Sequence, residues 1–186
     1  MKIISLHTSQ AALIKKAVQN NREAQKKIFE MLSPKMLNVC RQYVKDIHHA
    51  EELMLSGFLK VFNKLHTFKN EGSFEGWVRR IMVNTCISYL RKKNPIQLTE
   101  EEYMFSDLAI ENLENTSVED IQNLIDKLPE GYKMVFNLHA IEGYKHTEIA
   151  KKLGISESTS KSQLFKARKW LQKSYIKMNE VSDARK

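Results

Sequence analysis

The stretch GISESTSKSQLFKARKW, from Gly154 to Trp170, decides the fold of the C-terminal part of the chain. Apolar residues at three- and four-residue steps on either side of Gly154 predict a short helix before it and a longer basic helix after it. A short helix, a turn that contains glycine and a longer second helix are the parts of a helix-turn-helix. The residues that mark the two helices are Ile149, Ala150 and Leu153, then Leu164, Ala167 and Leu171.

The basic helix carries the side chains that a helix-turn-helix uses on DNA. In such motifs the N-terminal part of the second helix enters the major groove and contacts base edges. Hydroxyl, ammonium and amide groups there can reach bases or phosphates, and Gln suits adenine while Lys suits guanine. The alternative is a merely solvated basic surface. The predicted base-contacting residues are Ser158, Thr159, Lys161, Ser162 and Gln163, and the predicted phosphate-contacting residues are Lys166, Arg168 and Lys169.

The rest of the chain is predicted to be all-α as well. Residues 1–94 show four helical patterns and no sustained alternation typical of a strand. Ser73 is the predicted N-cap of the fourth helix. Two further patterns precede the helix-turn-helix, the first of them ended by Pro129. The marking residues are Ala12, Leu13 and Ala17; Ile28, Phe29, Leu32, Met36, Leu37 and Val44; Ala50, Leu53, Met54, Phe58, Val61 and Phe62; Trp77, Ile81, Thr85 and Tyr89; Ile121, Leu124, Ile125 and Leu128; and Met134, Val135 and Leu138.

Charge divides the chain into three parts. Residues 1–94 carry 17 Lys or Arg and 7 Asp or Glu, net +10, and residues 119–186 carry 13 and 9, net +4. The segment 95–118 begins with Pro95 and has 6 acids and no cation, net −6. We therefore predict two small helical domains, 1–94 and 119–186, joined by an acidic linker, 95–118. Two basic domains on a tether are typical of a protein that binds a polyanion.

Composition and motifs argue against several other classes. No apolar run approaches the ~20 residues of a membrane span, so membrane insertion is not expected. The two cysteines, Cys40 and Cys86, lack CxxC spacing, which favours a reduced, cytoplasmic protein. The segment HHAEE, residues 48–52, holds metal-ligand residue types without the spacing of HExxH. No nucleophile motif or phosphate-binding glycine loop is present, so neither an enzyme nor a cofactor or metal is expected.

Two segments together resemble one family. LPEGYKMVFNLHAIEGYKHTEIAKKLGISESTSKSQLFKARKWL, residues 128–171, resembles the promoter-reading domain of bacterial RNA polymerase sigma factors. AEELMLSGFLKVFNKLHTFKNEGSFEGWVRRIMVNTCISYLRKK, residues 50–93, resembles the segment with which the extracytoplasmic-function group binds core polymerase and melts promoters. The resemblance implies a non-enzymatic sigma factor that binds core RNA polymerase and directs promoter-specific initiation. Its partners would be core polymerase, duplex promoter DNA and the melted non-template strand, and an anti-sigma factor is a further possible partner.

The resemblance also implies a role for individual residues. The N-terminal domain would bind the polymerase clamp and the minus-ten element, and the C-terminal domain would bind the minus-thirty-five element. A melting site needs a pocket for an unstacked base and cations for the strand. Core polymerase would be contacted by Glu52, Leu55, Ser56, Phe58 and Lys60, the minus-ten element by Phe68, Trp77, Arg79, Arg80, Asn84 and Arg91, and the minus-thirty-five element by Ser158, Thr159, Lys161, Ser162, Gln163, Lys166 and Arg168.

Other interpretations of the melting residues stay open. Asn84 could be a structural residue, and Phe74 and Trp77 fit a core better than a base platform. Phe68 is the better pocket candidate. Arg79 and Arg80 cannot both face inward, so at least one is expected to be available for phosphate. The cluster of Arg91, Lys92 and Lys93 fits either phosphate contact or a solvated helix end.

The chain departs from the family pattern at four positions. Leu55 and Ser56 stand where the family commonly has Gln and an acid, which puts the strength of core binding in doubt. Ser160 stands at a position that is usually small and apolar, and Lys145 where a capping Ser or Thr is common. Two alternatives stay open: a helix-turn-helix regulator that acts without polymerase, with the N-terminal domain as a sensor or dimerisation unit, and a polymerase-binding decoy that does not initiate, which Leu55 and Ser56 suggest. The resemblance suggests that the linker threads toward the RNA path of the polymerase, although a solvating tether explains its charge equally well.

Overall fold

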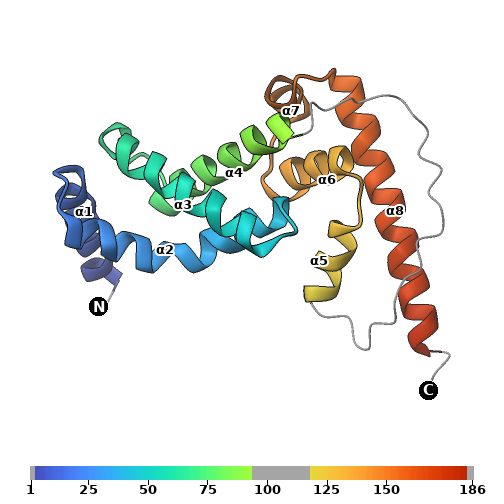
Figure 1. Ribbon diagram of the computed structural model, residues 1–186, viewed down its shortest axis with the longest axis horizontal. Coiled ribbons are helices and arrows are strands. Elements are labelled where there is room, and N and C mark those ends of the chain that lie inside the picture. The colour runs from blue at the N-terminus through green and yellow to red at the C-terminus, as the bar shows by residue number, and fades with distance from the viewer. Residues whose placement is uncertain (1–2, 94–117, 184–186) are drawn as a thin grey trace. The chain divides into compact units, whose positions relative to one another are not determined.

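The computed structural model describes residues 3–93 and 118–183, and the elements in these two ranges are helical, with no strand (Figure 1). The predicted all-α class is therefore confirmed. The chain separates into two compact units, Met1–Tyr89 and Leu90–Lys186. Residues 95–117 of the predicted linker lie outside the described residues, and Val118 begins a helix.

The N-terminal unit is built from four long helices with short connections. They are α1 (Ile3–Val18), α2 (Arg22–Tyr43), α3 (Ile47–Lys64) and α4 (Phe74–Lys93), with one 3₁₀ turn, η1 (Leu65–Thr67), after α3.

Polar side chains at their N-caps accept the first backbone N–H groups of three of these helices. The N–H of Ala24 donates to Asn21 Oδ1 over 2.9 Å at the start of α2, and the N–H of His49 donates to Asp46 Oδ1 over 2.9 Å at the start of α3. The predicted cap of the fourth helix is confirmed, because the Ser73 Oγ accepts from the N–H of Gly76 over 3.2 Å.

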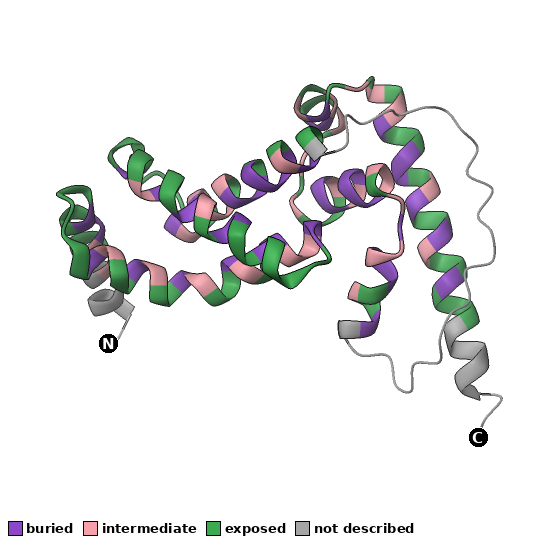
Figure 2. Cartoon of the chain, in the orientation of Figure 1, coloured by how far each residue is buried: buried purple, intermediate pink, exposed green. Residues whose placement is uncertain are grey.

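The core of this unit lies where α2, α3 and α4 turn their apolar faces inward (Figure 2). Val61, Met82 and Val83 have no exposed surface. Gly57 lets α3 approach α4 closely, since a Cβ atom at this position would overlap the sulfur of Met82. Close packing of this kind makes the relative positions of α3 and α4 rigid, and these two helices carry the predicted polymerase and melting residues.

Both cysteines belong to this core. Cys40 of α2 and Cys86 of α4 are free thiols with no exposed surface. A hydrogen bond with Cys40, together with burial, raises the pKa of the Cys86 thiol. The same hydrogen bond lowers the pKa of the Cys40 thiol. The two thiols pack as small side chains inside the core.

The C-terminal unit contains the predicted helix-turn-helix. Its elements are α5 (Val118–Asp126), α6 (Glu130–Phe136), a π-helical turn η2 (Asn137–Ile141), α7 (His146–Leu153) and α8 (Glu157–Asp183). Gly154 follows α7 in the left-handed region at φ +72°, where glycine carries no Cβ penalty, and its N–H donates to the carbonyl of Ala150. The chain thus leaves α7 and enters α8 within a few residues.

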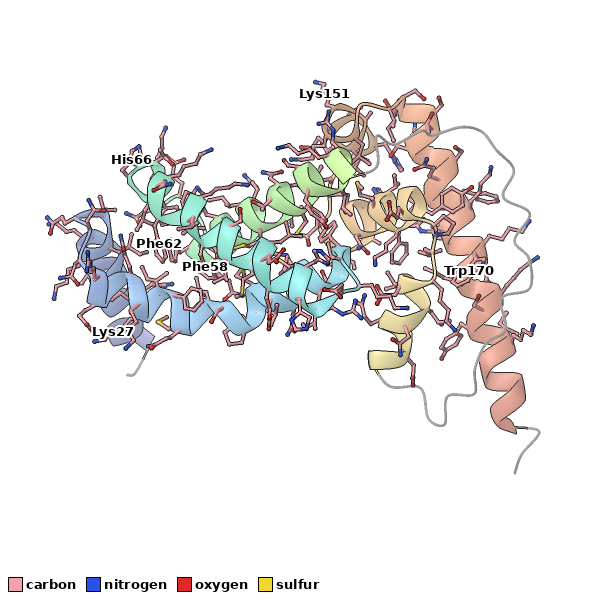
Figure 3. The ribbon with its side chains drawn as sticks, in the orientation of Figure 1. Lys27, Phe58, Phe62, His66, Lys151 and Trp170 are labelled. Atoms are coloured by element: carbon pink, nitrogen blue, oxygen red, sulfur yellow. The ribbon has the colours of Figure 1, made fainter. Side chains whose placement is uncertain are left out.

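Two contacts hold the helices of this unit together. Leu128, Ala167 and Trp170 form a buried cluster, with Tyr132 and Phe136 packed against it. Trp170 is labelled on α8 in Figure 3. The buried ammonium of Lys133 lies 2.6 Å from the carboxylate of Asp126 and connects α6 to the end of α5. We predicted that the first helix of this unit reaches Leu128, but α5 ends at Asp126 and Leu128 packs from the connection that follows.

Candidate nucleic-acid interface

The start of α8 is fixed by a cluster of hydroxyl groups. The Oγ of Ser156 accepts the N–H of Thr159 over 2.9 Å and lies 2.7 Å from the hydroxyl groups of both Ser158 and Thr159. The Oγ of Ser162 donates to the carbonyl of Thr159 over 3.0 Å. Ser156 thus caps the first turn of α8. The predicted DNA-contacting hydroxyls bond within this turn, which limits the conformational freedom that they lose on binding.

One face of α8 is exposed along several turns. Ser158, Lys161, Ser162 and Arg168 are exposed and recur at three- and four-residue steps, so they share this face. Thr159 and Lys166 are half-buried beside it. The exposed face is basic, and its spacing is that of a helix that lies in a groove with one side toward DNA.

Gln163 does not belong to this face. Its side chain is buried, 7% exposed, on the side of the helix that also holds Ser160, Leu164 and Ala167. Our expectation that Gln163 contacts a base is therefore wrong for this rotation of the helix. Position along the helix suggested the contact, but the 3.6-residue period turns this side chain toward α8's own packing partners.

An aromatic residue that we had not singled out occupies the exposed face instead. Phe165 is 66% exposed, one turn after Lys161 and Ser162. A Phe this exposed, between cations, is unusual for a merely solvated helix, and apolar side chains in the major groove can contact the thymine methyl group. In the sequence, its spacing of four residues from Lys161 places both side chains on one side of the helix.

The ammonium of Lys161 has an intramolecular partner. It lies 2.7 Å from the Glu157 carboxylate, one turn earlier on α8. The hydrogen bond and charge of Lys161 lower the pKa of the Glu157 carboxyl group, so this acid stays ionised. A DNA contact by Lys161 must therefore compete with Glu157.

Two departures from the family pattern have clear structural counterparts at α7. Lys145 occupies the N-cap without a capping side chain, and its N–H instead donates to the carboxylate of Glu148 over 2.8 Å. Ser160 is fully buried, and its Oγ lies 2.9 Å from Nδ1 of His146, the first residue of α7.

Three aromatic rings meet at the start of α4. The ring centroid of Phe68 lies 5.1 Å from that of Phe74 and 5.5 Å from that of Trp77. Phe74 is buried, as we expected of a core residue, whereas Phe68 and Trp77 are half-buried. The two partly exposed rings can offer an edge or face to a base without leaving the cluster.

Polar residues continue outward along α4 from this cluster. Arg80 and Asn84 are exposed and one turn apart, and Arg91 is exposed in the last turns of the helix. Arg79 is half-buried, which agrees with the expectation that the two neighbouring arginines do not both face inward. Arg80 and Asn84 therefore share one side of α4, as a strand-binding surface requires.

The predicted polymerase face on α3 is largely apolar, and its exposed residues differ in part from the predicted set. Glu52 is exposed, Leu55 is 50% exposed and Leu59, one turn later, is 67% exposed, while Ser56 is half-buried. Leu59 was not among the predicted contacts, although it lies four residues after Leu55 and therefore on the same side of α3.

Two predicted residues of α3 have other partners. Phe58 is buried, 2% exposed, with its ring centroid 4.8 Å from that of Phe29 and 6.0 Å from that of Phe62 (Figure 3). Our prediction that Phe58 contacts polymerase directly is therefore wrong, since this side chain belongs to the core. The Lys60 ammonium donates to Thr85 Oγ1 over 3.1 Å and so connects α3 to α4.

The described residues contain neither a metal-binding cluster nor a membrane span. Across residues 3–93 and 118–183, no group of three or more His, Cys, Asp or Glu residues could hold a metal ion. Over the same part of the chain, no helix combines the length and apolar character needed to cross a membrane.

Comparison with known proteins connects both units to one family. Residues 28–96 match Sigma-70 region 2 and residues 118–171 match Sigma-70, region 4. RNA polymerase sigma factor SigZ of Bacillus subtilis (strain 168) is 30% identical over 126 residues, 67% of this chain and 72% of that protein. ECF RNA polymerase sigma factor SigW of the same organism is 27% identical over 176 residues, 86% of this chain and 93% of that protein.

A solved structure shares the fold. The sigma factor RpoE, crystallised in complex with the anti-sigma factor NepR from Bartonella quintana, aligns with a TM-score of 0.52 at 20% identity, over 81% of this chain and 96% of that chain. Matches to both sigma regions, in the order in which this chain carries them, and relatives that align across both units leave one assignment. The chain belongs to the extracytoplasmic-function (ECF) group of RNA polymerase sigma factors.

Proposed function

We propose that this sigma factor binds core RNA polymerase, directs it to promoters with a defined upstream element, and takes part in opening the duplex. Sigma factors are transcription initiation factors and not enzymes. The observation that carries the proposal is the exposed face of α8, where Lys161, Ser162 and Phe165 lie together in the second helix of a helix-turn-helix.

The upstream contact is assigned to this face of α8. Lys161, Ser162 and Phe165 lie in its first turns, where a recognition helix reaches base edges. Arg168 and the half-buried Lys166 lie further along, in reach of the phosphate backbone. Phosphate contacts add affinity for any DNA sequence, whereas Phe165 and Lys161 would set the preference for particular bases in the upstream element.

Core binding is assigned to the exposed surface of α3. Glu52 supplies an acid, and Leu55 and Leu59 supply an apolar strip one turn apart. Two exposed leucines on one helix face fit the apolar centre of a protein interface, with the acid at its polar edge. The contact is thus more apolar than the family pattern would make it.

The minus-ten element and promoter melting are assigned to α4 and the loop before it. An extruded base needs a polar edge to bond with and an apolar or aromatic wall to stack on. Asn84 and Arg80 supply the polar groups, and the half-buried rings of Phe68 and Trp77 supply the wall. The strand would run along α4 toward Arg91.

The setting follows from these partners. A chain that works on core polymerase and promoter DNA acts in the cytoplasm. We extend the proposal to control by an anti-sigma factor, since the RpoE structure that shares this fold is a complex with one. The role proposed for residues 95–117 falls outside the described residues.

Reconstitution with core polymerase tests the proposal. The full chain is mixed with core polymerase, purified by size exclusion, and used in run-off transcription on a library of promoter fragments. Co-elution with core and a discrete set of start sites support the proposal. Duplex binding without core would identify an independent regulator, and co-elution with no transcript from any fragment would identify a decoy.

A further inference from the structure

The two helices of the helix-turn-helix are joined by a polar contact through a histidine. Ser160 of α8 is fully buried, and its Oγ lies 2.9 Å from Nδ1 of His146 at the start of α7. A buried hydroxyl group without a hydrogen-bond partner destabilises the fold, so this contact matters for the local packing. Ser160 precedes Lys161, whose side chain is exposed on the same turn of α8.

A second histidine stacks on the first. The ring of His139, in η2, lies 4.5 Å from that of His146 at an interplanar angle of 13°. Nδ1 of His139 lies 2.9 Å from the carbonyl oxygen of Tyr144. Because a carbonyl oxygen can only accept, Nδ1 of His139 must carry a hydrogen.

The surroundings of His146 favour its neutral form. Partial burial, the neighbouring His139 and the cations Lys161 and Arg168 all lower its pKa, and the Glu157 carboxylate opposes them more weakly. In the neutral ring, Nδ1 can accept the hydrogen of the Ser160 hydroxyl group. Once protonated, both ring nitrogens are donors, so Nδ1 can only donate to the Ser160 Oγ, and the hydrogen of the buried hydroxyl group loses His146 as its acceptor. Protonation also adds a third positive charge beside Lys161 and Arg168.

From this geometry we infer that His146 is a positioning residue, which sets the first turn of the recognition helix through Ser160 and makes upstream-element binding sensitive to protonation. This rests on the proposed role of α8 in binding the upstream element. His146 binds the proton, and its protonation changes how Lys161 and Phe165 are placed in the major groove of the upstream element.

The direction of the pH effect follows from the lowered pKa. The folded unit binds this proton less well than the unfolded chain does. At a pH above the ordinary pKa range of histidine, His146 is neutral in both states and does not destabilise the fold. As the pH falls through that range, the unfolded chain takes up protons first and the C-terminal unit loses stability. Upstream-element binding is therefore expected to weaken on the acid side.

The test uses the reconstituted holoenzyme and two promoter fragments that differ only in the upstream element, intact or scrambled. The ratio of the two affinities, measured between about pH 7.5 and about pH 5.5, isolates the contribution of α8 from the polymerase's own titration. For the wild type we expect this ratio to fall by about fivefold, the lower end of coupling between linked sites.

Three variants sharpen the result. His146→Asn keeps an oxygen that can accept from Ser160 and cannot titrate, so we expect a near-normal ratio at about pH 7.5 and little change at about pH 5.5. Ser160→Ala removes the hydroxyl group and should also flatten the profile. His48→Asn, at an exposed histidine of the N-terminal unit, should leave the wild-type profile unchanged.

The outcomes separate the inference from the proposed function. A wild-type holoenzyme with no preference for the intact element at about pH 7.5 would contradict the proposed function. A normal preference there with the same pH profile in wild type and His146→Asn would overturn the inference. If His146→Asn lost the preference for the intact upstream element at every pH, with an unchanged thermal midpoint, the coupling between His146 protonation and DNA binding would be overturned as well. Nitrogen-15 NMR of the full chain offers an independent check, because a hydrogen on Nδ1 of neutral His146 would contradict the assigned acceptor role.

Discussion

The Glu157 carboxylate holds the Lys161 ammonium at 2.7 Å, one turn apart on the recognition helix. An acid therefore restrains the cation that is best placed to contact a base or phosphate. Surface ion pairs of this kind contribute little, because solvent screens the two charges. That is small beside a DNA contact of about 1–3 kcal/mol, so DNA should win the competition at a measurable cost.

Removing this acid should strengthen DNA binding. In Glu157→Gln, Lys161 no longer has to leave an ion pair and the repulsion between the carboxylate and phosphate is lost, so we expect holoenzyme affinity to rise by about two- to fivefold. The affinity should be measured at several salt concentrations. Glu130→Gln makes the same charge change at the start of α6 and is the control. Equal effects of the two variants would show that only net charge matters.

Phe165 should contribute preference for thymine at one upstream position. In Phe165→Ala the loss should be about 1 kcal/mol for the best promoter and much less for promoters without that thymine. Replacing single thymines by deoxyuridine removes only the methyl group. One such replacement should weaken the wild type and leave Phe165→Ala unaffected. Tyr175→Ala, at another exposed aromatic residue of α8, is the control, and a response to deoxyuridine that is identical in Phe165→Ala and the wild type would exclude the contact.

Gln163 should affect packing and leave promoter preference alone. Its buried Oε1 has no hydrogen-bond partner among the described residues. Gln163→Leu should therefore keep the upstream preference and maintain or raise the thermal midpoint, because an unpaired buried polar atom costs about 1–3 kcal/mol. Selection from a randomised upstream element and a thermal melt check both parts. A changed preference at one position would return Gln163 to the DNA-contacting face.

The leucines of α3 should supply much of the affinity for core polymerase. Leu55→Ala and Leu59→Ala should each weaken core binding by about 1 kcal/mol, since each removes part of an apolar side chain from the interface. Met31→Ala, at a similarly exposed residue of α2, is the matched control. The binding constants can be measured by competition against a labelled sigma factor. If the control weakens binding as much as the leucine variants, the interface does not centre on α3.

Local chemistry made much of this architecture predictable. The Ser73 cap and the left-handed Gly154 turn depend on neighbours a few residues away, and both are present in the structure. The rotation of a helix about its axis depends on distant partners. Position along the helix placed Gln163 outward, and the family resemblance placed Phe58 at the polymerase interface, whereas packing buries both. The pairing of His146 with Ser160 joins residues fourteen apart across a turn, and nothing in the local pattern of either helix specifies it.

Melting of promoter DNA by core polymerase with this chain tests the central claim most directly. Permanganate modifies unpaired thymines, so it reports the opened segment position by position. With core and the full chain together, we expect reactive thymines around the minus-ten element, and neither component alone should produce them. Asn84→Ala should reduce this reactivity while leaving closed-complex binding nearly intact, because a base pocket acts only once the base has left the stack. Promoter binding by core plus chain with no reactive thymines on any promoter that it occupies would contradict the account.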